Sequence, residues 1–167
     1  KDESNIFKAL NRLDEIRYKD DFEFLILKLI KKEFFYTGIQ VESPKEIISQ
    51  MCDKLYDKGY VTGEFKESVI QRENISATSF VYGFSVPHSI NGRAAIQSTL
   101  SIAILNDPIK WGEFDVRFVI LLAITEDNRK MLRIFFDWLS SIISNSSKFA
   151  TMLEAKSYEE FVENILK

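Results

Sequence analysis

The residues with the clearest chemical potential lie at positions 80–91, which read FVYGFSVPHSIN and include His88, the only histidine of the chain. Pro87 fixes its own φ and biases Val86 toward an extended conformation. Phe84 and Val86 therefore read as the end of a β-strand. The pattern predicts that His88 emerges where this strand stops, and that its side chain is held there more firmly than on a free loop.

The sequence restricts what a single imidazole can do. The pentapeptide GFSVP at 83–87 is not the G-x-S-x-G turn of a serine hydrolase, and no glycine-rich phosphate loop is present. Cys52 is the only cysteine, so a zinc site of His and Cys ligands is excluded, and its place in an apolar stripe predicts a buried thiol. His88 is left as a nucleophile or a general base, beside a purely structural role. A neutral imidazole attacks phosphorus well, and a nearby arginine would stabilise the transferred group.

Helices and one strand are predicted before the His88 segment. Residues 21–36 fit one or two helical turns led by Asp20 or Asp21, followed by a strand near 34–36. The sequence Ser-Pro-Lys-Glu at 43–46 is a capping box with proline at the first helical position, and it predicts an amphipathic helix that continues to the next glycine. A second helix is expected from residue 62 or 63 to residue 72, with Phe65, Val69 and Ile70 facing the core.

Two strands are predicted after the His88 segment. Residues 99–105 read as a strand that Asp107-Pro108 ends, and residues 109–112 as the loop that follows. Trp111 in this loop could serve as part of a docking surface, but a packed corner is the favoured interpretation. Residues 116–125 are almost all apolar, which is typical of a strand buried on both faces.

Helices dominate the last third of the sequence. Asp127 is expected to cap a long helix, a short helix is expected at 149–153, and a second capping box at 157–160 predicts the last helix. Helices and strands thus alternate around one buried strand. This alternation predicts a single α/β domain, a three-layer α/β/α sandwich with a mixed central sheet. The core residues expected from the long helix are Leu132, Phe135, Phe136, Leu139, Ile142 and Ile143.

Composition limits the partners and the location of the domain. The 167 residues carry a net charge of −3 that is spread along the chain, which argues against direct binding of nucleic acid or an anionic membrane. The longest apolar run is too short to cross a bilayer and no signal peptide is visible, so we expect a cytoplasmic protein without membrane insertion. Residues 1–20 read as a linker or leading helix and residues 21–167 as the domain. Because the chain starts at Lys1, we expect it to be part of a longer protein.

Two motifs resemble a known family. The segments SVIQRENISAT at 68–78 and GFSVPH at 83–88 resemble the mannitol/fructose type (type 2) of enzyme IIA domain of the bacterial sugar phosphotransferase system. The sequence PIKWG at 108–112 also resembles a loop of that family. The resemblance covers the chain from about Phe34 to its end, and the Arg-Glu pair combined with Val-Pro-His is its most specific part.

The resemblance implies roles for individual residues. His88 matches the histidine that accepts a phosphoryl group from the phosphocarrier HPr, and Arg72 matches the arginine that steadies the phosphate. Glu73 matches a residue with a structural, orienting role. Enzyme IIB or attached regulatory domains would be the further partners, and no cofactor or metal is implied.

The sequence departs from the family in three respects. Val81 and Ser85 stand where many relatives have glycine and alanine. Members of the mannitol type also carry a second histidine after the long buried strand, and this chain offers only Asn128, Arg129 or Lys130 there. That histidine assists onward transfer to enzyme IIB, so its absence weakens the case for transport.

Three functions follow from these observations. The favoured one is a sugar-responsive regulatory domain, phosphorylated on His88, at the end of a transcription regulator of the antiterminator/activator type. The alternative is an enzyme IIA transport component that passes phosphate from HPr to enzyme IIB. The third is a non-catalytic α/β interaction domain with an inert His88. Whether the domain is an enzyme in its own right is left open.

Overall fold

The computed structural model describes residues 23–167. The predicted linker at 1–20 and the predicted helix start at Asp20 or Asp21 lie outside the described residues. Residues 23–29 form a helix that leads directly into a strand beginning at Ile30. The expected succession of a short helix and a strand is therefore present, although the strand begins earlier than residue 34.

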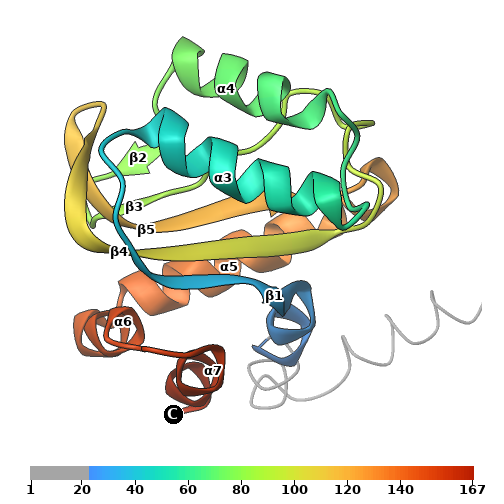
Figure 1. The fold of residues 1–167 in the computed structure, drawn as a ribbon. Coiled ribbons are helices and arrows are strands. Elements are labelled where there is room, and N and C mark those ends of the chain that lie inside the picture. Colours follow the sequence, from blue (N-terminus) through green and yellow to red (C-terminus); the bar gives the residue numbers. More distant parts are fainter. Residues whose placement is uncertain (1–22) are drawn as a thin grey trace, which may run out of the picture.

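Helices and strands alternate along the described chain (Figure 1). In chain order they are β1 (Ile30–Ile39), α3 (Pro44–Asp57), α4 (Phe65–Ile75), β2 (Ser79–Phe80), β3 (Phe84–Ser85), β4 (Thr99–Trp111), β5 (Phe114–Ala123), η1 (Glu126–Asn128), α5 (Lys130–Ile143), α6 (Ser146–Leu153) and α7 (Tyr158–Leu166). The five strands form one sheet in the order β1-β4-β5-β3-β2. β1 is parallel to β4 and β3 to β5, whereas the pairs β4–β5 and β2–β3 are antiparallel, so the sheet is mixed.

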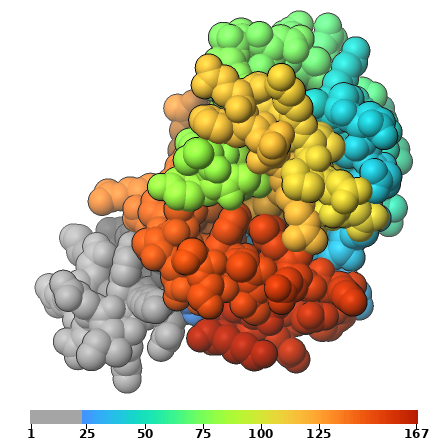
Figure 2. All heavy atoms as spheres, turned by 90° about the vertical axis from the view of Figure 1, so that its left-hand side faces the viewer, coloured from blue at the N-terminus to red at the C-terminus, as the bar shows by residue number. Residues whose placement is uncertain are grey.

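Two hydrophobic cores lie on opposite faces of this sheet. One core packs α3 and α4 against the sheet, and the other packs α5, α6, α7 and the helix at 23–29 against its opposite face. Figures 1 and 2 show the two helical layers with the sheet between them. β5 lies between β4 and β3, and its residues from Phe118 to Ala123 are all buried. The predicted three-layer sandwich around one buried strand is confirmed.

β4 differs from its prediction. It runs unbroken through Asp107-Pro108, so the expected break there is wrong, and so is the expected loop at 109–112 apart from its last residue. β1 pairs with β4 only as far as Leu105, and the register between β4 and β5 shifts over residues 104–109. Proline lacks a backbone N–H and is tolerated at such an irregularity on a strand with one neighbour. The strand therefore continues past a residue that normally ends one.

The helix caps follow their sequence signals at two of three places. Ser43 and Ser157 each accept a hydrogen bond from the backbone N–H of the glutamate three residues later, as a capping box requires. The predicted cap at Asp127 is wrong, because this residue lies inside the 3-10 turn η1, and α5 begins only at Lys130. α4 begins at Phe65 and ends at Ile75, both later than predicted.

The expected core face of α5 is correct except at one position. Phe135, Leu139 and Ile142 are buried, and Leu132 and Ile143 are partly buried against the same core. Phe136, which was expected to face inward, is 45% exposed. It lies next to the pocket described below, so its exposure belongs to the site and not to the core.

Candidate functional site

His88 lies just beyond β3, as its sequence context predicts. It forms an isolated parallel bridge with Leu122 of β5, and the Leu122 backbone N–H donates a hydrogen bond of 3.0 Å to the Pro87 carbonyl. Because β5 is the buried central strand, this bridge fixes the backbone of His88 to the centre of the sheet. The histidine is therefore held as an extension of the sheet.

The hydrogen bond of the imidazole defines which of its nitrogens can react. His88 Nδ1 lies 2.9 Å from the Val86 carbonyl oxygen. A carbonyl can only accept, so Nδ1 carries the proton and Nε2 of the neutral ring has a free lone pair. The ring is thereby oriented by its own backbone, and Nε2 is the nitrogen available as a nucleophile or a base.

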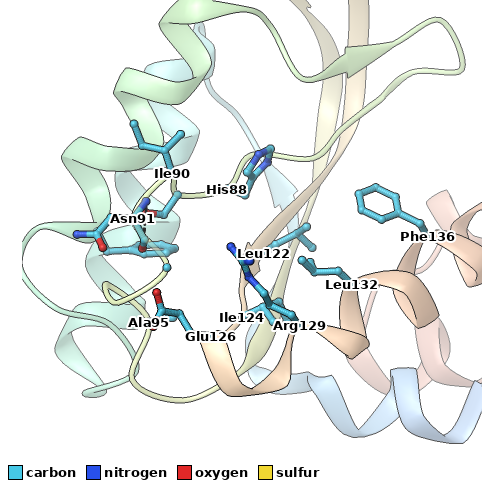
Figure 3. A pocket seen from close by; sticks show the side chains of 13 residues that line it. His88, Ile90, Asn91, Ala95, Leu122, Ile124, Glu126, Arg129, Leu132 and Phe136 are labelled. Carbon is cyan, nitrogen blue, oxygen red and sulfur yellow. Dashed lines mark hydrogen bonds between the residues drawn. The ribbon is translucent and has the colours of Figure 1, made fainter.

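A pocket of about 170 Å³ lies beside His88 (Figure 3). Its walls come from the loop after His88, the start of α4, the end of β5 and the segment that leads into α5. Most of the lining is apolar, and the charged groups are few. The lining residues are Phe65, His88, Ser89, Ile90, Asn91, Gly92, Ala95, Leu122, Ile124, Glu126, Arg129, Leu132 and Phe136.

A small polar network joins the His88 loop to α4. Ser89 Oγ lies 2.6 Å from Ser68 Oγ, and the Asn91 backbone N–H donates to both hydroxyls at 2.9 and 3.3 Å. Ser68 is buried on α4, so the network sets how closely this helix approaches the loop. Sequence analysis did not single out these serines. A spacing of three and seven residues between Phe65, Ser68 and Arg72 would have indicated one helix face.

Arg72 lies on the same face of α4 as Phe65 and Ser68. Phe65 lines the pocket, and Ser68 joins the helix to the His88 loop through Ser89. Its Nη1 donates a hydrogen bond of 2.8 Å to the Ser76 carbonyl, just past the helix end. Arg72 does not line the pocket itself. A guanidinium has five N–H donors, so this one hydrogen bond leaves most of them available to other acceptors.

Glu73, next to Arg72, organises the turn after α4. Its carboxylate accepts hydrogen bonds from the Thr78 backbone N–H at 2.7 Å, from Thr78 Oγ1 at 2.8 Å and from Trp111 Nε1 at 2.6 Å. Trp111 is 1% exposed, so it forms the packed corner that was the favoured interpretation. Glu73 links α4, the turn before β2 and the β4–β5 hairpin, which is a structural arrangement.

The structure separates the three residues, Asn128, Arg129 and Lys130, that the sequence offers after the long buried strand. Arg129 lines the pocket with His88, whereas Asn128 and Lys130 line a different hollow beside Thr125. Glu126 also lines the His88 pocket and lies 3.9 Å from Arg93. The sequence could not indicate that Arg129 is the one of the three that lines the His88 pocket, because the 3-10 turn directly before it was not predicted.

Other reactive groups lie away from this pocket. Burial raises the pKa of the Cys52 thiol to about 12, so Cys52 stays protonated at neutral pH and is a poor nucleophile. Residues 23–167 contain no cluster of three or more His, Cys, Asp or Glu side chains arranged to hold a metal ion. In the same described part of the chain, no helix is long and apolar enough to cross a membrane.

The fold and the site together define a class of domain: an α/β/α sandwich that holds one imidazole with a free Nε2 at the end of a short strand. The chain belongs to a family within that class. The family model described as phosphoenolpyruvate-dependent sugar phosphotransferase system, EIIA 2, matches residues 28–167. The resemblance of the two sequence motifs is thus confirmed.

Three similar proteins illustrate the range of this family. The transcriptional regulator ManR of Bacillus subtilis is 27% identical over 139 residues, which are 83% of this chain and 21% of the regulator. The mannitol-specific phosphotransferase enzyme IIA component of Bacillus subtilis is 25% identical over 138 residues, 81% of this chain and 95% of that protein. Enzyme IIA for mannitol of Escherichia coli, solved in complex with phosphorylated enzyme IIB, matches with a TM-score of 0.71 at 18% identity and covers 82% of this chain and 96% of its own. The chain therefore spans about a fifth of the regulator and nearly all of the transport component.

Proposed function

We propose that His88 accepts a phosphoryl group from phosphorylated HPr. The Nε2 lone pair forms a new bond to phosphorus while the nitrogen–phosphorus bond of the donor breaks, and its electron pair returns to the donor histidine. Nδ1 keeps its proton throughout and donates a hydrogen bond to the Val86 carbonyl. The contact of 2.9 Å between His88 Nδ1 and the Val86 carbonyl oxygen, which leaves Nε2 free beside an open pocket, is the observation that carries this proposal.

Arg72 is proposed to stabilise the charge of the transferred group. It lies on the face of α4 that the Ser68–Ser89 hydrogen bond holds against the His88 loop. A guanidinium forms bidentate hydrogen bonds to phosphate oxygens, and such bonds are stronger when both groups are charged. The hydrogen bond to the Ser76 carbonyl limits how far Arg72 can swing away from this position.

We further propose that phosphorylation serves regulation. The chain spans only about a fifth of ManR, a transcriptional regulator, so a domain of this kind occurs inside a much longer regulatory protein. The second histidine of the transport type is absent, and an arginine lines the pocket instead. Under this proposal the domain works in the cytoplasm, and attached regulatory domains respond to the phosphorylated state.

The decisive experiment is the intact mass of the chain after incubation with phosphoenolpyruvate, enzyme I and HPr. We expect a gain of one phosphoryl group that is labile in acid, as expected of a phosphohistidine. A matched reaction without HPr should show no gain. An unchanged mass in the presence of phosphorylated HPr contradicts the proposed function and leaves a non-catalytic α/β domain.

Transfer to enzyme IIB separates regulation from transport. The phosphorylated chain is mixed with an enzyme IIB of the mannitol type, and the phosphoryl content of both proteins is followed over time. Retention on this chain, under conditions in which a mannitol enzyme IIA loses its group, supports the regulatory role. Rapid loss to enzyme IIB supports the alternative, a sugar-transport component.

Replacing Arg72 with glutamine is expected to slow phosphorylation about tenfold to a hundredfold, because one charge-assisted contact to the transferred group is lost. The measurement is the initial rate of mass gain at limiting phosphorylated HPr. Lys66→Gln, a change on the same helix at a residue that pairs with Asp53, is the control and should leave the rate unchanged. An Arg72→Gln rate equal to that of the unmodified chain contradicts the role of Arg72.

A further inference from the structure

Arg129 is a cation in the His88 pocket whose charge the described protein does not neutralise. Within residues 23–167 its guanidinium forms neither a hydrogen bond nor a salt bridge. Figure 3 shows its side chain rising into the pocket, with the guanidinium nitrogens on the side toward His88. Exposed arginines commonly point into open solvent, whereas this one occupies the wall of a pocket.

The position of Arg129 follows from the fold around it. β5 ends at Ala123, the 3-10 turn η1 covers residues 126–128, and Arg129 follows directly before α5 begins. His88 is bridged to Leu122 of the same strand. Both residues therefore attach to the carboxyl-terminal end of β5: His88 through its backbone bridge, and Arg129 through the 3-10 turn that follows the strand.

Apolar and charged side chains share the lining of this pocket. Leu122, Ile124 and Leu132 line it together with Arg129, whose side chain is exposed and therefore accessible to an anion. Glu126 is the one carboxylate among the lining residues, and Arg93 Nε lies 3.9 Å from its Oε2. The pocket thus holds one partly balanced carboxylate and one guanidinium with no anion.

We infer that Arg129 binds the phosphoryl group carried by His88, together with Arg72, and that it does so with a charge that pH does not remove. This inference rests on the proposed function of His88. Phe65 at the start of α4 and Arg129 line the same pocket, and Arg72 lies two turns further along α4 on the face of Phe65. Arginine stays protonated at any physiological pH, whereas a histidine at this place would lose its charge near neutrality.

This permanent charge favours keeping the phosphoryl group over passing it on. An imidazole can give up its charge as the group leaves, but a guanidinium stays attracted to the phosphate oxygens. The phosphorylated state should therefore be longer-lived than with a titrating residue at position 129. A regulatory domain that reports the phosphorylation state of HPr benefits from a longer lifetime of its own phosphorylated form.

The first test compares Arg129→Gln with the control Arg133→Gln, which removes an equal charge one turn along α5 and outside the pocket. Initial rates of phosphorylation by phosphorylated HPr and rates of return transfer to unphosphorylated HPr are measured by intact mass. We expect Arg129→Gln to lower the equilibrium constant for phosphoryl transfer from HPr about tenfold and Arg133→Gln to leave it unchanged. If the unmodified chain is phosphorylated and Arg129→Gln reaches the same equilibrium, the inference is overturned. If the unmodified chain is not phosphorylated at all, the proposed function fails first.

The second test uses Arg129→His to separate charge from shape. The groups that titrate or carry charge at this pocket are His88, Glu126 and residue 129, with Arg93 next to Glu126. At each pH, the equilibrium constant for phosphoryl transfer from HPr to Arg129→His is divided by the constant for the unmodified chain. This ratio removes the titration that both proteins share. We expect this ratio to approach one near pH 5.5 and to fall about tenfold by pH 8, as the introduced imidazole loses its proton. A ratio that does not change with pH rejects a role for the charge of Arg129.

Discussion

Replacing His88 with glutamine is expected to abolish phosphorylation by HPr, with a rate at least about a thousandfold lower than that of the unmodified chain. Glutamine has a similar reach, but its amide nitrogen shares its lone pair with the carbonyl and does not attack phosphorus. His88 is the only imidazole of the chain, so no other histidine can replace it. The measurement is the mass gain at saturating phosphorylated HPr.

The effect of His88→Gln must be distinguished from a loss of fold. His88 is partly buried, and its backbone bridge to Leu122 does not depend on the side chain. We therefore expect the free energy of unfolding, measured in urea, to lie within about 0.5 kcal/mol of that of the unmodified chain. A folded variant that still gains one phosphoryl group would show that the acceptor is a different residue, and the mechanism through Nε2 would then be wrong.

The position of His88 could be predicted because the signals that place it are local. Pro87 and the apolar alternation before it act within a few residues, and β3 does end at Ser85, shortly before Pro87 and His88. The same holds for the helices that begin at Ser43-Pro44 and at Ser157, where side chain and backbone bond within one turn. Local chemistry therefore determined the position of the candidate acceptor.

Features that depend on neighbouring strands could not be predicted in this way. Pro108 usually ends a strand, yet β4 passes through it because β5 still pairs with the strand on one side beyond the irregularity. Whether a second strand lies alongside is decided by residues far away in the sequence. The same is true of Arg129, which enters the pocket only because β5 ends next to the His88 bridge.

Phe136 shows how a functional surface departs from a core pattern. Its spacing along α5 fits the apolar face, which is why a buried position was predicted. The structure leaves it 45% exposed at the rim of the His88 pocket. Departures from local rules are expected to gather at functional sites, because binding requires surface that folding alone would cover.

Replacing Glu73 with alanine is expected to lower the free energy of unfolding by about 2–4 kcal/mol. The carboxylate accepts three hydrogen bonds, and Trp111 Nε1, one of the donors, belongs to a side chain that is 1% exposed. Removing the acceptor leaves this buried donor without a partner, and burying an unpaired donor costs more than one hydrogen bond normally contributes. Urea unfolding at 25 °C measures the change as a lower midpoint with an unchanged slope.

Two further variants show whether the three hydrogen bonds cause this loss. Glu73→Gln keeps one carbonyl oxygen as an acceptor for Trp111 Nε1, so it should lose only about half as much stability as Glu73→Ala. Glu67→Ala removes an exposed carboxylate from the same helix and should change stability by about 0.5 kcal/mol or less. Equal losses for Glu73→Ala and Glu67→Ala would mean that the carboxylate of Glu73 does not hold α4 to the β4–β5 hairpin. The predicted difference instead shows that Glu73 fixes the end of α4 to the turn before β2 and to the β4–β5 hairpin.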